Sequence, residues 1–300
     1  MPNQKSYKLD QNIIVQVLDT KEEIAQKALE ILIPEIQKNS EIVLGGSTGN
    51  SPKEFYKQLR EKIEKGESDL SKATIIFLDE YFGRLNYHHY THAELYYKIS
   101  EDARNRTFKK QNIITPKSCF YLENMLIDSE KLEKILNENK NDWEFRDPEI
   151  YIKETAKNPV LKEVRDVCEK YEDLIDKGIA WQILGIGVEG HIGFNEKGTK
   201  EDSLTHLTKL AASTLNSNKD DFQDGFLSTY SITQGINSLS KAKNRILFAM
   251  GKNKQTAIHN TLYGEISPSN PAAYLRKMPG TTYIFLDKEC AKALKSKNLK

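Results

Sequence analysis

Short apolar runs alternate with longer amphipathic segments along most of the chain, and this alternation constrains the fold more than any other feature. The runs lie at residues 12–18, 41–45, 73–78, 181–186, 245–250 and 281–286. Each has the length of a strand, and its apolar residues are nearly continuous, as in strands buried on both faces of a parallel sheet. The alternation of strands and helices therefore predicts an α/β fold, with a doubly wound, mostly parallel sheet and helices on both faces.

Two of the intervening segments carry clear helix signals. In the segment that follows residue 19, Thr20 and Glu23 have the spacing of a capping box. Its apolar residues recur at helical spacing, at Ile24, Ala28, Leu32 and Ile36. A second helix is expected to start at Ser51 and Pro52. Its predicted buried face consists of Phe55, Tyr56 and Leu59.

Residues 125–160 do not follow this alternation of apolar runs and amphipathic segments. They carry many charges and few apolar positions, with no convincing core strand and one expected helix near 129–137. We interpret this region as a surface insertion. Because there is no internal repeat or low-complexity linker, the prediction is a single domain over residues 1–300.

Composition excludes several classes of function. The 300 residues include 44 Lys and Arg against 43 Asp and Glu, a net charge of +1, so nucleic acid and anionic membranes are not expected partners. No run approaches the roughly 18 apolar residues of a membrane-spanning helix, and the start lacks a signal-peptide pattern. The three cysteines are far apart, which suggests reduced thiols. We therefore expect a cytoplasmic protein.

Ligands of open parallel sheets bind beyond the carboxyl ends of the strands, so functional residues are expected in the loops after the predicted strands. The first, "GGSTGNSP" at 45–52, lies between a strand and a helix start. Its small residues and hydroxyls, at Gly46, Ser47, Thr48 and Gly49, would suit a phosphate. A plain turn is the alternative. The Gly-Lys-Ser/Thr ending of an ATP-binding loop is missing.

The second loop begins with "LDEYFG", in which Asp79 and Glu80 are expected to end an apolar strand. A carboxylate at this position could act as a general base, or it could simply cap a turn. Downstream, His88, His89 and His92 lack an acidic or cysteine partner at a diagnostic metal-binding spacing, so no metal site is expected.

The third loop, "GIGVEGHIGFNE" at 185–196, has the glycine spacing of a dinucleotide-binding turn. The residues that follow oppose a helix, however, so we expect no nucleotide cofactor. What remains is His191 bracketed by Glu189 and Glu196. Carboxylates can orient an imidazole and raise its basicity for proton transfer, and the alternative is a structural polar turn.

Together the loops resemble the glucosamine-6-phosphate deaminase family, which belongs to a wider group with 6-phosphogluconolactonases and galactosamine-6-phosphate isomerases. The matching segments are "LGGSTGNSP", "LDEYFG" with "HHYTHAEL", "CEKYEDLIDKGIAWQILGIGVEGHIGFNE" and "GKNKQTA". The resemblance covers most of the chain outside 125–160. It implies a Rossmann-like sheet that binds a hexose 6-phosphate without nucleotide, metal or organic cofactor.

The resemblance also implies roles for individual residues. Asp79 matches the base that takes the C2 proton and returns it at C1, and His191 matches the ring-opening histidine. Glu196 matches the partner of that histidine, and Glu189 stands where the family usually has an aspartate. For the phosphate, the matching residues are Ser47, Thr48, Gly49 and Lys254.

Two departures accompany these matches. The family's phosphate-binding arginine has no counterpart, because Asn218 or Lys219 occupies its neighbourhood. The basic residues used for allosteric activation in some members also have no clear match, so activation by N-acetylglucosamine 6-phosphate is not expected.

The predicted reaction converts glucosamine 6-phosphate and water to fructose 6-phosphate and ammonia. A 6-phosphogluconolactonase is the alternative within the wider group, but Tyr81 and Ile192 stand where lactonases usually have arginine and threonine. A non-catalytic sugar-phosphate sensor is the competitor from another class. The expected partner is a small sugar phosphate, and a homo-oligomer is compatible with the sequence. The stereochemistry of the sugar at C4 stays open.

Overall fold

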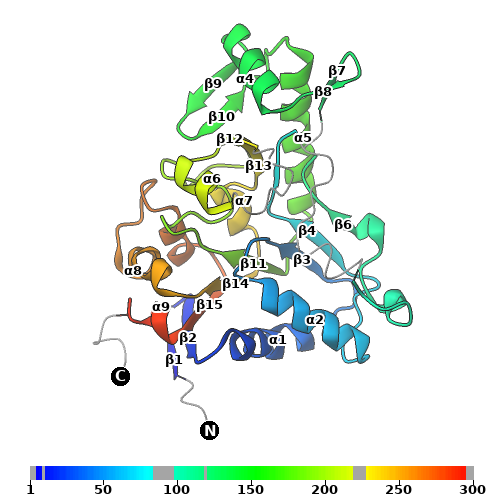
Figure 1. The fold of residues 1–300 in the computed structure, drawn as a ribbon, viewed down its shortest axis with the longest axis vertical. Helices are drawn as coiled ribbons and strands as arrows, with labels where there is room; N and C mark the ends of the chain where they lie inside the picture. Colours follow the sequence, from blue (N-terminus) through cyan, green and yellow to red (C-terminus); the bar gives the residue numbers. More distant parts are fainter. Residues whose placement is uncertain (1–4, 9–10, 84–97, 118–119, 219–227, 295–300) are drawn as a thin grey trace.

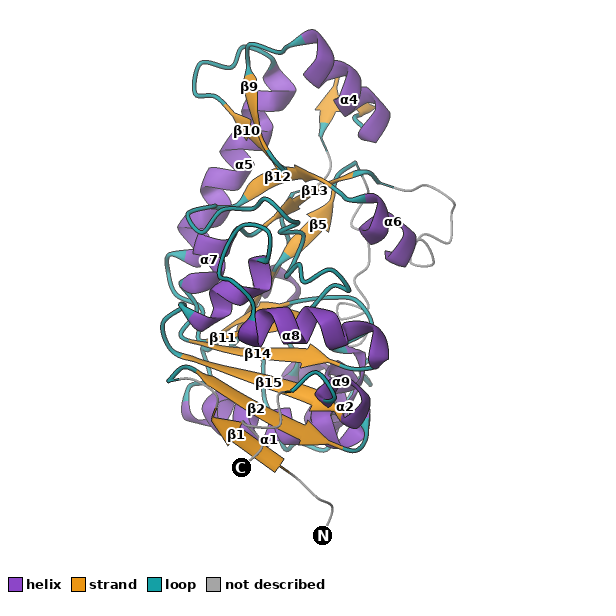
Figure 2. Cartoon of the chain, turned by 90° about the vertical axis from the view of Figure 1, so that its left-hand side faces the viewer, coloured by secondary structure: helices purple, strands orange, loops and turns teal. Residues whose placement is uncertain are grey.

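The computed structural model describes residues 5–8, 11–83, 98–117, 120–218 and 228–294. Its larger sheet has the strand order β1-β2-β15-β14-β11-β3-β4-β6 (Figures 1 and 2). The strands are β1 (Lys5–Lys8), β2 (Ile13–Leu18), β3 (Val43–Gly46), β4 (Thr74–Phe77), β6 (Ile113–Ile114), β11 (Trp181–Gly185), β14 (Asn244–Ala249) and β15 (Thr281–Asp287). Apart from the antiparallel β1–β2 pair, neighbouring strands are parallel. All six predicted strands are present, and the mostly parallel α/β sheet is confirmed.

Both faces of this sheet are buried, which explains the continuous apolar runs. On one face, alternate strand residues such as Ile183 and Ile246 join a core with α1 (Lys21–Lys38) and α2 (Lys53–Glu64). The intervening residues, such as Leu184 and Leu247, face α7 (Ile236–Ser240), α8 (Gln255–Tyr263) and α9 (Lys288–Ala291). Helices on both faces confirm the doubly wound arrangement.

The two predicted helices begin close to their expected positions. Oγ1 of Thr20 accepts from the N–H of Glu23, which makes Thr20 the N-cap of α1. The second helix starts at Lys53 with Pro52 as its N-cap, so its first turn lies slightly later than predicted. Its buried residues include Phe55, Tyr56 and Leu59, as expected.

A second, smaller sheet lies beyond the first and was not predicted (Figure 2). Its order is β5-β13-β12-β10-β9, with all neighbours antiparallel. The strands are β5 (Asp79–Tyr81), β9 (Trp143–Arg146), β10 (Glu149–Ile152), β12 (His206–Lys209) and β13 (Tyr230–Thr233). The helices α4 (Ser129–Glu138) and α5 (Pro159–Ile175) share a buried core with this sheet.

The absence of a core strand in residues 125–160 was therefore a wrong expectation. The region contains β9 and β10, and Ile150 and Ile152 of β10 are buried in the core beside α5. Because Glu149 and Tyr151 alternate with these isoleucines, the strand lacks the continuous apolar run by which the other strands were predicted. The helix expected near 129–137 is confirmed as α4. The division into one domain with a surface insertion stays a prediction.

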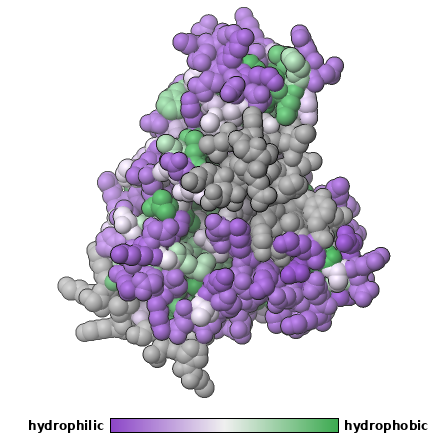
Figure 3. Space-filling model, viewed as in Figure 1, coloured by the Kyte–Doolittle hydropathy of each residue, from purple (hydrophilic) through white to green (hydrophobic). Residues whose placement is uncertain are grey.

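The remaining elements are short. They comprise the hairpin β7 (Tyr121–Leu122) and β8 (Met125–Leu126), the helix α6 (Ala212–Asn218), and 3-10 turns η2 (Arg104–Arg106), η3 (Lys110–Asn112), η5 (Lys252–Lys254) and η6 (Pro271–Arg276). Hydrophilic residues dominate the described part of the face seen in Figure 3. Among the described helices, none has the length and apolar character needed to cross a bilayer.

Candidate active site

The carboxyl ends of β3, β4, β11 and β14 lie at one edge of the parallel sheet, because parallel strands all end on the same side. Each of the three loops singled out in the sequence starts at one of these ends. The "GKNKQTA" segment follows β14, whose last residue is Ala249. The topology therefore gathers the candidate residues at one edge.

The small-residue loop after β3 is tightly built. A Cβ on Gly46 would come within 2.9 Å of the Phe77 ring, so glycine is needed there. Ser47 is buried, and its N–H donates to Oη of Tyr56 over 3.1 Å. Gly49 has a φ of +84° and is exposed, just ahead of α2. The loop thus lies against a helix start, where an anion would meet the positive end of the helix dipole.

Asp79 does not end the apolar strand β4 but begins β5 in the second sheet. Its side chain is buried, and its backbone pairs with Thr233 of β13. The backbone just before Asp79 is also hydrogen-bonded, since the N–H of Gln234 donates to the carbonyl of Leu78 over 2.8 Å. The neighbouring Glu80 accepts from the N–H of Tyr81 over 2.9 Å, so its carboxylate turns onto its own strand.

His191 and Glu196 form the central contact of the third loop. Nδ1 of His191 lies 3.2 Å from Oε2 of Glu196, and the Glu196 side chain is almost fully buried. Nδ1 of His191 has no partner with hydrogen-bond geometry among the described residues, so the contact is a close approach that becomes an ion pair when the imidazole is protonated. Oε1 of Glu196 accepts from Oγ1 of Thr214 over 2.5 Å.

The environment of Glu196 favours its charged form. Burial raises the pKa of this carboxyl, but His191, Thr214 and the backbone N–H of Ala211 together hold the pKa below its ordinary value. Glu196 is therefore an anion at neutral pH, which suits a group that must stabilise a protonated imidazole.

Gly187 makes room for the imidazole. A Cβ at this position would overlap the Cε1 and Nε2 atoms of the His191 ring. The loop closes through the N–H of Gly187, which donates to the carbonyl of His191 over 2.9 Å, and Gly190 takes a φ of +89°. The glycine spacing that resembles a nucleotide turn therefore serves to place a histidine.

The same strand, β13, holds both the Asp79 segment and the His191 loop. Thr233 pairs with Asp79 and, through Oγ1, accepts from the N–H of Phe194 over 3.2 Å. Asn195 donates to the carbonyl of Gln234 over 2.8 Å. In addition, the Phe194 ring lies 5.2 Å from that of Tyr81. The structure thus brings the candidate base and the candidate histidine loop onto one support.

Glu189 does not bracket His191 in the way the sequence suggested. Its carboxylate is exposed and lies 3.6 Å from Nζ of Lys197. Within the described residues it makes no ion pair with His191. Of these two glutamates, Glu196 has the contact expected of an orienting group.

Lys254 ends η5 directly before α8, beyond the end of β14. Its side chain is half-buried, and burial lowers the pKa of the ammonium group. No carboxylate of the described chain pairs with it. A partly desolvated cation without an anion at the ligand edge is suited to a phosphate.

Several expected features lie outside the described residues: His88, His89, His92 and Lys219, along with Cys119. Asn218 is the last residue of α6. In the described ranges no cluster of His, Cys, Asp and Glu has the arrangement of a metal site. Cys168 and Cys290 are buried free thiols.

The sequence missed three residues that support this site: Tyr56, Thr214 and Thr233. Only Tyr56 had a signal, as part of the predicted buried face of α2. Thr214 and Thr233 are far from their partners in sequence, so only the folded chain identifies them.

The fold is that of an α/β protein, with the candidate site at the carboxyl edge of its parallel sheet. Comparison with known proteins makes this more specific, although no family model matches the chain. A glucosamine-6-phosphate deaminase from Thermoanaerobacter pseudethanolicus is 32% identical over 282 residues, covering 93% of this chain and 94% of the relative. One from Clostridium botulinum is also 32% identical, over 286 residues, with 94% and 98% covered.

Comparison with solved structures points to the same family. A monomeric glucosamine-6-phosphate deaminase of the NagB superfamily has a TM-score of 0.71 at 25% identity, covering 93% of this chain and 99% of that one. A 6-phosphogluconolactonase from Trypanosoma brucei has a TM-score of 0.63 at 14% identity, covering 97% and 100%, which shows a shared fold. The chain belongs to the glucosamine-6-phosphate deaminase family.

Proposed function

We propose that this chain is an enzyme that converts glucosamine 6-phosphate and water to fructose 6-phosphate and ammonia. The observation that carries the proposal is the joint anchoring of Asp79 and the His191–Glu196 loop on β13. Membership of the deaminase family supports the same reaction. The proposed setting is amino-sugar metabolism in the cytoplasm.

The reaction needs three proton transfers, and we assign them to two separate catalytic groups. The pyranose must open, a proton must leave C2 and return at C1, and the departing amine must be protonated. In our proposal Asp79 acts on carbon, as a buried carboxylate at a fixed position. His191, paired with Glu196, moves protons at the ring oxygen and the anomeric hydroxyl. Glu189, turned toward Lys197, has no direct part.

The phosphate would be held at a distance from this chemistry. The small-residue loop of Gly46, Ser47, Thr48 and Gly49 lies directly ahead of α2, where the helix dipole attracts an anion, and Lys254 supplies a cation. Such remote binding orients the reacting carbons and contributes to both ground and transition states. Lys254 is the candidate to take over part of the role of the missing arginine.

The deciding experiment offers the purified protein three substrates: glucosamine 6-phosphate, its C4 epimer galactosamine 6-phosphate, and 6-phosphogluconolactone. Ammonia and ketose 6-phosphate are measured for the first two, and lactone hydrolysis for the third. Equal amounts of ammonia and fructose 6-phosphate from the gluco substrate are expected. Lactone hydrolysis without ammonia release would instead define a lactonase, and binding without turnover would define a sensor.

A further inference from the structure

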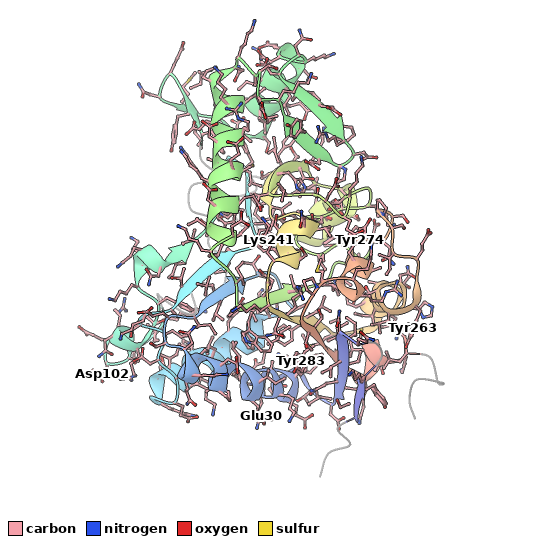
Figure 4. The ribbon with its side chains drawn as sticks, turned by 180° about the vertical axis from the view of Figure 1, so that it is seen from behind. Glu30, Asp102, Lys241, Tyr263, Tyr274 and Tyr283 are labelled. Atoms are coloured by element: carbon pink, nitrogen blue, oxygen red, sulfur yellow. The ribbon has the colours of Figure 1, made fainter. Side chains whose placement is uncertain are left out.

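A cavity of about 340 Å³ lies between α5, β10 and β12. Its walls include none of the residues assigned to the proposed reaction. The volume is in the range of pockets that hold small molecules. Figure 4 shows α5 extending along this part of the molecule, with Lys241 near its lower end.

His206 on the cavity wall has an unmet hydrogen-bonding need. The residue is 4% exposed, and its Nδ1 lies 2.7 Å from the carbonyl oxygen of Leu204. A carbonyl only accepts, so Nδ1 carries the proton, and Nε2 of the neutral ring is an acceptor. In the described part of the chain this buried Nε2 has no partner. Burial lowers the pKa of His206 in spite of the nearby Glu149 and Glu172, which keeps the ring neutral.

Glu149 supplies a second acceptor on the same face. In the β10–β12 register Glu149 pairs with Thr208, two residues after His206, so both side chains project to the same side of the sheet. Oε2 of Glu149 accepts from Oγ of Ser203 over 2.8 Å. Among the described residues no cation pairs with this half-buried carboxylate.

Glu172, the other carboxylate near His206, is already satisfied. It accepts from the N–H of Thr205 over 2.8 Å and from Oγ of Ser238 over 2.5 Å. Nζ of Lys241 lies 2.7 Å from its Oε2. The available negative charge beside His206 is therefore that of Glu149.

The balance of charges around the cavity favours a cation. Five carboxylates line it, at Glu149, Glu154, Glu169, Glu172 and Asp202, against three cations, at Arg146, Arg165 and Lys200. Arg165 pairs with Asp166 and Glu169, and Lys241 neutralises Glu172, so Glu149, Glu154 and Asp202 remain against Arg146 and Lys200. The Arg146 guanidinium covers the Tyr151 ring at 3.6 Å. A phosphate ester would meet net negative charge here, whereas a positively charged ligand would be attracted.

We propose that this cavity binds a small protonated amine that also carries hydroxyl groups, such as an unphosphorylated amino sugar or an amino alcohol. The ammonium group pairs with Glu149, and a hydroxyl donates to Nε2 of His206. The residues that line this cavity include none of those assigned to the proposed reaction.

The test follows the side-chain nitrogen resonances of His206 and His191 by NMR in protein carrying ¹⁵N-labelled histidine. Glucosamine, glucose and glucose 6-phosphate are titrated separately at neutral pH. Glucosamine is expected to shift the Nε2 resonance of His206, with a Kd of about 1 mM or tighter. Glucose, which lacks the charge, should bind at least about tenfold more weakly. Glucose 6-phosphate should leave His206 unchanged, even if it shifts His191.

Glu149→Gln keeps an acceptor for Ser203 but removes the charge, so it should weaken glucosamine binding by about tenfold or more. Glu163→Gln, on α5 but outside the cavity, is the matched control and should bind as the wild type does. An unmoved His206 resonance would overturn the proposal and leave a water-filled cavity. Equal binding of glucosamine and glucose in the wild type would overturn it too, whether or not the variant folds.

Discussion

The hydroxyl of Thr214 donates to Oε1 of Glu196 over 2.5 Å and so ties α6 to the carboxylate that faces His191. The two oxygens of Glu196 then have separate partners, and Oε2 stays turned toward the imidazole. In the proposed mechanism Thr214 positions Glu196 without touching the substrate.

Replacing Thr214 with valine should lower kcat by about tenfold, the effect of losing one hydrogen bond to a charged group, with KM little changed. The pH profile gives a second readout. The Glu196 pKa lies below its ordinary value, so the carboxylate and its stabilising contacts persist above that range and are lost as pH falls through the lowered pKa. Removing a donor raises this pKa, so the acidic limb of kcat/KM should move to higher pH.

Thr214→Ser retains the donor and is the matched control for this prediction. It should restore both the rate and the acidic limb to nearly wild-type values. A Thr214→Val profile that superimposes on that of the wild type would show that Thr214 only packs α6 against the loop.

Gly187→Ala should reduce kcat by about a hundredfold, because the new Cβ would force the His191 ring from its position. Gly185→Ala, two residues earlier, offers the comparison, since its Cβ would lie 3.7 Å from that of Ser51, an ordinary contact. Steady-state kinetics with glucosamine 6-phosphate should separate the two variants. Similar losses in both would mean that the loop tolerates no added side chain, independent of the imidazole.

Lys254→Ala should raise KM for glucosamine 6-phosphate by about tenfold or more while changing kcat little, because the phosphate contact would exist in ground and transition states alike. Lys252→Ala tests a neighbouring, exposed lysine in the same turn and should keep the wild-type KM. If both lysines gave the wild-type value, Lys254 would have no place in the phosphate site.

The larger sheet could be predicted because its strands are buried on both faces and therefore read as apolar runs. The second sheet could not, since its buried strands carry polar residues such as Thr208, Ser231 and Thr233. In sequence these resemble loops, and their hydroxyls find partners only in the folded chain.

The candidate loops were identifiable for a related reason, since loops at strand ends form the ligand edge of such folds. The detailed geometry of the site could not be predicted from the sequence. Glu189 and Glu196 look equivalent on either side of His191, but one meets Lys197 at the surface and the other is buried with Thr214. That choice depends on where α6 lies, which no local pattern encodes.

Arg245 provides a test of stability rather than activity. Its guanidinium is fully buried and donates to backbone carbonyls of Leu239, Ser240, Ala242 and Pro279. Arg245→Met would leave these carbonyls without donors, so the free energy of unfolding should fall by about 3 kcal/mol or more. Urea denaturation measures this, with exposed Arg104→Met expected within about 0.5 kcal/mol of wild type. A small loss at Arg245 would mean that other donors replace the guanidinium.

In the proposed mechanism Asp79 moves the proton between C2 and C1, and hydrogen exchange tests this role most directly. Asp79→Asn preserves the size of the buried side chain but removes the base. Glu80→Gln is the matched control, since the neighbouring carboxylate is turned onto its own backbone.

In heavy water, the wild type and Glu80→Gln should incorporate deuterium into the sugar and release ammonia when given glucosamine 6-phosphate. Asp79→Asn should do neither, while its affinity for the sugar phosphate, measured by calorimetry, changes by no more than about threefold. Deuterium incorporation at the wild-type rate in Asp79→Asn would contradict the account.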